Sequence, residues 1–395
     1  MKGIHEVLAE LRESAFDERH KGDLFEALTK KYLEIDPFYR TYFDKVWLYG
    51  DWAEETGLSK QDTGIDLVAR VSETGEIAAM QCKFFAEGAY LDKKEIDSFF
   101  TASGKEPFRE RYIFSTTDNW SRHASEAVEG QQIPTLIIRV QDLDDSGIDW
   151  SDFSLENPTK LGLLKKKTPF AHQLEAIEAA KSHFQNHDRG KMIMACGTGK
   201  TYTSLRIAHE LTPKGGTVLF LVPSLALLSQ TLKEWKREAT TDFRAYAVCS
   251  DSKLSRQSSS EDTRVADLAY PSTTNVEKLA AHFNQGTDAE LTVIFSTYQS
   301  IDVVAQAQGK GLPVFDLIVC DEAHRTTGVT LVDEDESAFV RVHDNNFIKG
   351  SKRLYMTATP RIFAEASKAK AEEASAVIAS MDDETKFGEE FHRLN

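Results

Sequence analysis

The amino-acid sequence predicts an α/β protein in which a domain with a mixed sheet is followed by a lobe with a parallel sheet. In the first part, apolar runs at 64–71 and 77–85 flank a glycine-containing turn, which is the pattern of a β-hairpin. In the second part, apolar runs end in polar or glycine-containing turns and feed into helical patterns, as in strand–helix–strand units. The 395 residues exceed what one hydrophobic core usually supports, so we expect two domains.

The composition is that of a soluble globular chain, with 41% hydrophobic and 28% charged residues. No apolar run approaches the roughly 20 residues of a membrane span, and the amphipathic N-terminus lacks the features of a signal peptide. The four cysteines show no CxxC spacing, which argues for a reducing cytoplasm and against structural zinc. We therefore expect a cytoplasmic protein with no membrane partner.

The formal net charge of −16 counts against strong non-specific affinity for nucleic acid, because a basic domain is its usual signature. Much of the acidic excess is concentrated in three short segments, 142–149, 333–336 and 381–384. Basic patches can coexist with this average, but their location cannot be read from the sequence.

The first domain is expected to begin with helices at 5–12 and 22–35, where apolar residues recur at helical spacing. A strand and turn follow at 45–52, before the hairpin. The buried stripe of the second helix is expected to contain the following residues: Leu24, Phe25, Leu28, Tyr32 and Leu33.

The hairpin carries a candidate site for phosphodiester hydrolysis. Asp66 lies early in its first strand, whereas Gln81 and Lys83 lie late in the second, so antiparallel pairing brings them together. Asp66 and the carbonyl oxygen of Gln81 would bind Mg²⁺, and Lys83 would orient or activate water and stabilise developing charge. Glu26, from the preceding helix, is a candidate second carboxylate.

After the hairpin, the pattern predicts a helix at 90–103, a strand at 111–117, a helix at 119–130 and a strand at 135–140. A mixed sheet flanked by helices results.

The expected division of the chain is a first domain at 1–150, a linker at 151–168 and an ATPase lobe at 169–395. Residues 141–168 lack periodicity and contain Gly, Pro, Asp and a Lys-Lys-Lys run. A serine-rich stretch at 250–264 is expected to be a mobile loop, and 362–380 has helix-forming composition.

The second lobe is organised around Lys191–Thr201, in which an apolar strand runs into a glycine turn and a helix. This arrangement is a phosphate-binding loop, because backbone N–H groups and the positive end of the helix face the phosphates. Lys200 would reach the β- and γ-phosphates, and the Thr201 hydroxyl would meet Mg²⁺. The glycine that the full motif requires is replaced by Met194. The nucleotide-binding residues of this loop are Gly197, Thr198, Gly199, Lys200 and Thr201.

Downstream, the strand at 315–320 delivers Asp321, Glu322 and His324 at its carboxyl end. Asp321 would hold Mg²⁺ through water, and Glu322 would polarise the attacking water. His324 would connect the bound nucleotide to the remainder of the ATPase lobe.

Further segments complete the pattern of the nucleotide site. The segment 353–360 reads as an apolar strand ending in Thr357, Ala358 and Thr359. Gln173 lies just before a predicted helix, where its amide could read the adenine edge. The segments 218–230 and 293–300 each read as a strand that runs into a polar turn.

Taken in chain order, these six segments resemble motifs Q, I, Ia, Ib, II and III of superfamily 2 helicases of the DEAH kind. The resemblance tolerates Met194, because the superfamily often lacks the first glycine. It implies a RecA-like lobe that binds ATP and Mg²⁺, with Gln173, His324, Thr357 and Thr359 among the nucleotide-site residues.

Residues 15–140 resemble a second family, the Mrr-like branch of the PD-(D/E)XK nucleases. The helix with GDLFEAL, the strand GIDLVA and the strand MQCKF carry this resemblance. Gln81 stands where the wider superfamily has Asp or Glu, and Mrr-like members commonly carry Gln there. The uncharged amide implies a lower metal affinity.

An Mrr-like nuclease followed by a DEAH-type motor resembles the N-terminal half of Type ISP restriction-modification enzymes. This resemblance implies double-stranded DNA as partner and ATP-driven translocation before cleavage. It also implies continuation into a second RecA-like lobe, a coupler, a methyltransferase and a target-recognition domain. Because the arginines of the second lobe complete the site, the chain by itself is expected to hydrolyse ATP poorly.

Two alternatives remain open at this point. One is a helicase-nuclease defence protein that lacks a methyltransferase or is directed at modified DNA. The other is a non-catalytic regulatory module whose nuclease fold only grips DNA. A methyltransferase motif in the downstream sequence would favour the restriction-modification enzyme over the first alternative. Metal-dependent nicking of plasmid DNA would favour a nuclease over the second.

Overall fold

The computed structural model divides the chain into two units, and each is described by itself. Unit 1 contains residues 1–165 and 263–271, and unit 2 contains 166–262 and 272–395. The structure describes residues 2–60, 64–86, 88–129, 131–155, 157, 160–250, 265–285, 289–331, 338–368 and 376–394. The serine-rich stretch from 251 onward and the acidic segment 333–336 lie outside the described residues.

Unit 1 is built on a mixed sheet that, within the described residues, has five strands in the order β1-β2-β3-β4-β5. The pairs β1–β2 and β2–β3 are antiparallel, whereas β3–β4 and β4–β5 are parallel and are joined by helical crossovers. This confirms the predicted mixed sheet with its hairpin. The strands are β1 (Phe43–Leu48), β2 (Leu67–Val71), β3 (Ile77–Lys83), β4 (Phe108–Ser115) and β5 (Thr135–Arg139).

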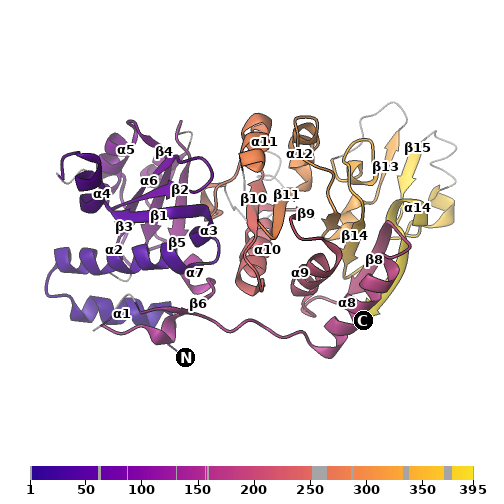
Figure 1. Ribbon diagram of the computed structural model, residues 1–395, viewed down its shortest axis with the longest axis horizontal. Coiled ribbons are helices and arrows are strands. Elements are labelled where there is room, and N and C mark those ends of the chain that lie inside the picture. Colours follow the sequence, from indigo (N-terminus) through magenta and orange to yellow (C-terminus); the bar gives the residue numbers. More distant parts are fainter. Residues whose placement is uncertain are drawn as a thin grey trace. The chain divides into compact units, whose positions relative to one another are not determined.

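Helices cover both faces of this sheet because its strands alternate apolar residues on each side. On one face, α2 (Glu18–Ile35) packs through Phe25 and Tyr32, and α1 (Ile4–Ser14) lies beside it (Figure 1). On the other face, Ile113 of β4 packs with Phe99 of α5 (Asp97–Ser103) and Ala124 of α6 (Arg122–Val128). Asp17 begins α2 by accepting a hydrogen bond from the His20 N–H at 2.7 Å.

Two local predictions in unit 1 are wrong. The stretch 49–52, expected as a turn, forms the helix α4 (Tyr49–Thr56), which is anchored by the buried Trp52. The expected helix at 90–103 is broken. Leu91 forms a β-bridge with Trp120, and only a 3₁₀ turn, η1 (Lys93–Glu95), and α5 are helical. In both places a tertiary contact overrides the local periodicity.

The stretch between the two sheets contributes structure to unit 1 as far as Lys165. It forms α7 (Val140–Asp144), the strand pair β6 (Ile148–Asp149) with β7 (Gly162–Leu163), and a 3₁₀ turn, η2 (Trp150–Asp152), between them. Leu143, Trp150 and Phe153 are buried there.

Unit 2 is built on a parallel sheet whose described strands follow the order β10-β11-β9-β12-β14-β8-β16 (Figure 1). Its central strands are buried along their whole length, which explains their nearly continuous apolar sequences. This confirms the predicted parallel-sheet lobe. The strands are β8 (Arg189–Met194), β9 (Gly216–Val222), β10 (Arg244–Val248), β11 (Leu291–Thr297), β12 (Leu317–Cys320), β14 (Arg353–Thr357) and β16 (Glu389–Leu394).

Helices also cover this second sheet. Trp235 of α10 packs edge-on against Phe220 and Phe295, whereas Ile301 of α12 packs on the core that contains Ile294. The principal helices are α8 (Ala171–His183), α9 (Lys200–Leu211), α10 (Leu225–Glu238), α11 (Val276–Gln285), α12 (Ile301–Gln308) and α14 (Glu384–Phe387). No helix among the described residues combines the length and apolarity needed to cross a membrane.

Helix-forming composition misleads near the end of the chain. Residues expected to be helical form β15 (Ala376–Ala379), which pairs antiparallel with β13 (Gly328–Leu331). The short Ala-Val-Ile-Ala sequence suits a strand once a partner is present.

A segment from the second half of the sequence, residues 263–271, belongs to unit 1 and is called the excursion. It contains the 3₁₀ turn η4 (Val265–Asp267) and then Leu268, Ala269 and Tyr270, all of them buried. The ring of Tyr270 lies 4.3 Å from that of Phe38, and the Tyr39 hydroxyl donates a hydrogen bond to the Ala269 carbonyl.

An ion pair fastens the same excursion to the sheet of unit 1. Arg139 at the end of β5 contacts Asp267 at 2.7 Å. Leu268, Ala269 and Tyr270 are therefore part of the core of unit 1 although they follow β10 in sequence.

We predict that Leu268→Ala lowers the free energy of unfolding of unit 1 by about 2–5 kcal/mol, because a fully buried leucine is removed from a packed core. Hydrogen exchange at β5 during urea titration measures this. Leu155→Ala, which truncates an exposed leucine of the same unit, is the control. Equal exchange in the two variants would contradict the assignment of this segment to the core.

Candidate nuclease and nucleotide-binding sites

Asp66 is held immediately before β2 by three main-chain interactions. Its N–H donates to Met80 O at 2.9 Å, and its carbonyl accepts from Tyr49 N at 2.8 Å. Its carboxylate accepts the Cys82 N–H at 2.6 Å. Since β2 pairs Leu67 with Met80, continuing this register brings Asp66 opposite Gln81 and on the same face. The hairpin thus fixes the carboxylate next to the second strand.

Gln81 presents a buried carbonyl oxygen that lacks a hydrogen-bond partner. The residue is 2% exposed, its Nε2 donates to Gly64 O at 3.0 Å, and its Oε1 makes no hydrogen bond in the structure. Leaving such a buried acceptor unsatisfied costs about 1–3 kcal/mol. An amide oxygen beside a carboxylate is a suitable ligand set for Mg²⁺. The donor set of Asp66 and Gln81 therefore fits a divalent cation.

Asp66, Gln81 and Lys83 line a single cavity of about 810 Å³ in unit 1. Lys83 follows Gln81 by two residues on β3, so both side chains lie on one face of the strand. The remaining wall includes aromatic residues that the sequence analysis did not assign to the site: Tyr49, Trp52 and Phe108. Trp52 and Phe108 reach it from α4 and β4, and no local sequence signal indicated this.

Glu26 lies on the neighbouring helix α2 and is not among the residues that line the cavity. It is nevertheless close to the hairpin. Burial, and then the charges of Asp66 and Glu26, raise the pKa of the Cys82 thiol well above its usual range. Both carboxylates are thus near Cys82, and the catalytic role of Glu26 stays a prediction.

In unit 2, the phosphate-binding loop follows β8, and α9 begins at Lys200. Gly197 and Gly199 have φ angles of +78° and +83°, which L-residues with side chains rarely adopt. A Cβ atom on Gly199 would also lie 2.3 Å from Gln173 Nε2. The Lys200 ammonium donates to Met194 O at 3.2 Å, so it lies folded over the loop. The backbone conformation favours glycine at both positions, and at Gly199 a side chain would also displace the Gln173 amide.

Gln173 and His172, at the start of α8, bind the loop directly. Gln173 Nε2 donates to Thr198 O at 3.1 Å, and its Oε1 accepts the Phe170 N–H at 2.9 Å. The His172 ring lies 3.1 Å from the same Thr198 carbonyl. Both ends of the Gln173 amide thus bond main chain, and its adenine-reading role stays a prediction. The sequence analysis missed His172.

Asp321 leaves β12 at the same edge of the sheet and is 7% exposed. Burial, with the neighbouring Glu322 carboxylate, raises the pKa of Asp321 to about 6, although Lys200 acts in the opposite direction. The influence of Lys200 indicates that the two motifs lie close together. Tyr298, a second residue that the sequence analysis missed, fixes the turn by donating its hydroxyl to Asp321 O at 2.9 Å.

His324 connects the end of β12 to the end of β14. Its Nδ1 lies 3.0 Å from Thr357 Oγ1 and 3.3 Å from the Glu322 carboxylate. Thr357 Oγ1 also accepts the Thr359 N–H at 3.2 Å. Burial lowers the pKa of His324, and Glu322 opposes that shift. The structure therefore joins the acidic motif to the Thr357–Thr359 turn through one imidazole.

Thr201 lies in the first turn of α9, and its carbonyl accepts the Trp235 indole N–H at 3.1 Å. A cation between the Thr201 hydroxyl and Asp321 would offset the unfavourable ionisation of the buried carboxylate. The residues present thus fit a Mg²⁺–nucleotide complex.

We predict that Asp321→Asn increases the free energy of unfolding by roughly 1–3 kcal/mol at about pH 7.5 without nucleotide. The folded protein binds a proton here more tightly than the unfolded chain, whose pKa is near 3.8, so stability falls as pH rises through about 6. The gain should therefore shrink at about pH 5. Urea denaturation at both pH values tests this, with the exposed Asp188→Asn as control. A gain that is independent of pH would refute the ionisation argument.

Two family models match most of the chain. Residues 34–160 match a restriction endonuclease model, and residues 166–362 match the model of the res subunit of Type III restriction enzymes. In solved structures, the whole chain matches an ATP-dependent Type ISP restriction-modification enzyme, LlaBIII bound to DNA. The TM-score is 0.81, the sequence identity is 36%, and 25% of that chain is covered.

Curated relatives match shorter stretches. The chain is 30% identical over 229 residues to the probable helicase A859L of African swine fever virus, covering 57% of this chain and 23% of that protein. It is 27% identical over 208 residues to the endonuclease subunit of the Type I restriction enzyme EcoAI of Escherichia coli, covering 51% and 20%. The chain thus spans about a quarter of the length of these proteins. It therefore carries a restriction endonuclease domain followed by a domain of the Type III res-subunit family, and over its whole length it is similar to part of a Type ISP restriction-modification enzyme.

Proposed function

We propose that this chain supplies the nuclease and the first motor lobe of an ATP-dependent, DNA-translocating restriction endonuclease. The observation that carries the nuclease part is the unpartnered Gln81 Oε1 beside the Asp66 carboxylate and Lys83 in one cavity. The motor part rests on the phosphate-binding loop and the Asp321–His324 motif at one edge of the sheet.

In the proposed nuclease reaction, Asp66 and Gln81 hold Mg²⁺ and Lys83 orients the attacking water. Mg²⁺, when bound, would supply positive charge that stabilises the pentacoordinate phosphorus of the transition state and lowers the pKa of water. Lys83 adds a second positive charge at the position where negative charge develops. Glu26 remains a candidate second carboxylate.

In the proposed ATPase, Lys200 contacts the β- and γ-phosphates while Thr201 and Asp321 hold Mg²⁺. Glu322 polarises water, and the His324–Thr357 contact transmits the state of the nucleotide. Gln173 would read adenine after releasing its present partners. The described residues form one RecA-like lobe, so we expect slow hydrolysis without an arginine from a second lobe, which is worth about 10³–10⁵ in rate in related enzymes.

Double-stranded DNA is the proposed substrate. The LlaBIII structure, which matches over the whole length of this chain, is of an enzyme bound to DNA. Lys83 and Lys105 line the cavity of unit 1 and would offset the acidic average of the chain near the scissile phosphate. Because that average is acidic, binding should depend on the remainder of an intact enzyme.

We predict that Lys83→Ala and Asp66→Ala each reduce Mg²⁺- or Mn²⁺-dependent nicking of supercoiled plasmid by at least about 100-fold. Lys45→Ala, an exposed lysine on β1 of the same sheet, should nick as the unmodified chain does. Unchanged hydrogen exchange in strands β1–β5 would show that unit 1 of the variants is folded. Undiminished nicking by Lys83→Ala would refute the nuclease assignment and favour a module that only grips DNA.

Lys200→Ala is expected to weaken binding of a fluorescent ATP analogue by about 10–100-fold, because hydrogen bonds from an ammonium to phosphate are lost. Lys214→Ala removes an exposed lysine from the same unit and serves as the control. Metal-dependent nicking should persist in both. Equal affinity of Lys200→Ala and the unmodified chain would exclude the phosphate role of this loop.

A further inference from the structure

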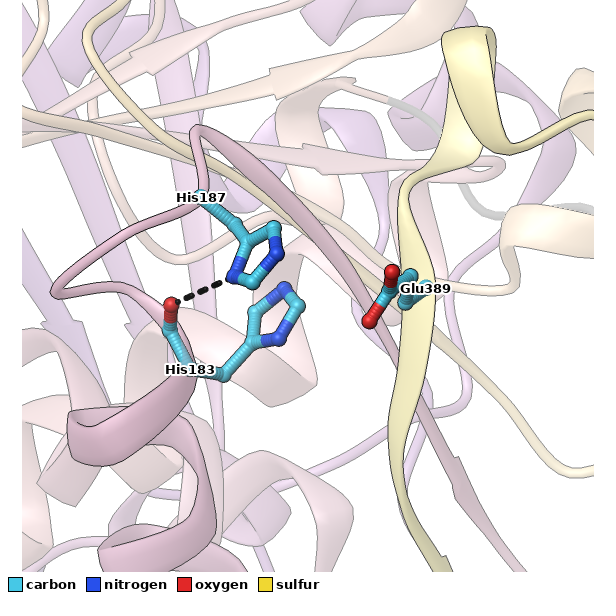
Figure 2. A group of neighbouring side chains, drawn as sticks. All are labelled: His183, His187 and Glu389. Carbon is cyan, nitrogen blue, oxygen red and sulfur yellow. Dashed lines mark hydrogen bonds between the residues drawn. The ribbon is translucent and has the colours of Figure 1, made fainter.

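Two histidines and a carboxylate meet in unit 2 among residues that neither proposed site uses. His183 is the last residue of α8, His187 lies in the turn before β8, and Glu389 begins β16. One nitrogen or oxygen ligand atom from each lies within 4.8 Å of the others. Figure 2 shows the two rings side by side and the Glu389 carboxylate directed toward them from the neighbouring strand.

Backbone carbonyl groups fix the protonation of both rings. His183 Nε2 lies 2.7 Å from Arg189 O, and His187 Nδ1 lies 3.1 Å from His183 O. A carbonyl oxygen only accepts hydrogen bonds, so each of these nitrogens carries a proton. The other nitrogen of each neutral ring then has a lone pair available for a metal. Such hydrogen bonds orient histidine ligands in metal sites.

The His183 ring is held in place by its surroundings, whereas the side chains of His187 and Glu389 are exposed. Its ring stacks on His187 at 4.3 Å and on Phe391 at 5.2 Å. A Cβ atom on Gly190 would come within 2.6 Å of His183 Nε2, so glycine lets the ring lie against β8. His187 and Glu389 are exposed and can rotate.

Metal binding requires a rearrangement of the exposed side chains. Ligand atoms of a tetrahedral site with bonds of about 2.0–2.1 Å lie roughly 3.3–3.4 Å apart. The rings of His183 and His187 are stacked with their planes 5° apart, so His187 has to rotate out of this stack, giving up its hydrogen bond to His183 O, before both rings can direct a lone pair at one ion. A water molecule would complete the coordination.

We propose that His183, His187 and Glu389 form a binding site for a late first-row divalent metal ion of the Zn²⁺ type. Two imidazoles and one carboxylate favour Zn²⁺, Co²⁺ or Ni²⁺ over Mg²⁺, which prefers oxygen ligands. The site is thus chemically distinct from the two proposed Mg²⁺ sites. The cysteine spacing argued against structural zinc, but this ligand set uses no cysteine.

The ion would link the end of α8 to β16, the terminal strand of the described sheet. The opposite end of α8 carries His172 and Gln173, which hold the phosphate-binding loop. Binding would therefore stabilise a helix that spans from the metal site to the nucleotide site.

The test is titration of the chelator-treated chain with Co²⁺, read by visible absorption, and with Zn²⁺, read by calorimetry, in excess Mg²⁺. We expect His187→Gln and Glu389→Gln to weaken Zn²⁺ binding by at least about 10–100-fold, since loss of an outer hydrogen-bond partner alone costs that much. The matched controls are His123→Gln and Glu390→Gln, which change exposed residues of the same types.

The proposal requires that the controls bind as the unmodified chain does and that Zn²⁺ raises the melting temperature of the unmodified chain but not of the two site variants. Retained ATP-analogue binding would show that these variants are folded. If the unmodified chain gives no Co²⁺ absorption band, or if the site variants bind Zn²⁺ equally well, the cluster is only a histidine–carboxylate contact and the proposal is overturned.

Discussion

The geometry of unit 2 depends on one constraint, which is that parallel strands bring all their carboxyl ends to the same edge of the sheet. The strand interiors are apolar and buried, so polar side chains can gather only where these strands end. Lys200, Asp321 and Thr357 follow or end three strands that are far apart in sequence but adjacent in the sheet order β12-β14-β8. The arrangement of the proposed nucleotide site is therefore a direct result of the strand order.

Sequence patterns predicted those features that depend on strand period and chain order. The hairpin pattern was sufficient to predict that antiparallel pairing brings Asp66 to Gln81 and Lys83, and in the structure all three line one cavity. Tertiary partners escaped prediction. The helix at Tyr49–Thr56 and the strand at Ala376–Ala379 are stabilised by packing and pairing that local composition does not encode. The bond from Gln173 to Thr198 O was hidden for the same reason, since this partner lies in a loop 25 residues away.

The two proposed Mg²⁺ sites present their ligands in different ways. At the hairpin, Gln81 is neutral and buried, and its side-chain oxygen has no hydrogen-bond partner. The unfavourable free energy at this site is therefore that of one missing hydrogen bond. At the end of β12, Asp321 is an acid whose ionisation is opposed by burial and by Glu322. In both cases a bound cation would remove an unfavourable state of the protein, which ties ion binding to local stability.

The excursion at residues 263–271 means that the chain passes between the two units three times, after residues 165, 262 and 271. Leu268 and Tyr270 are apolar surface that only unit 1 covers. A shortened chain that starts at residue 166 would lack the rest of unit 1 and would therefore expose this apolar segment to solvent. Removing the segment as well would avoid that exposure. Conversely, a single protease nick after residue 165 would leave both pieces joined by noncovalent contacts.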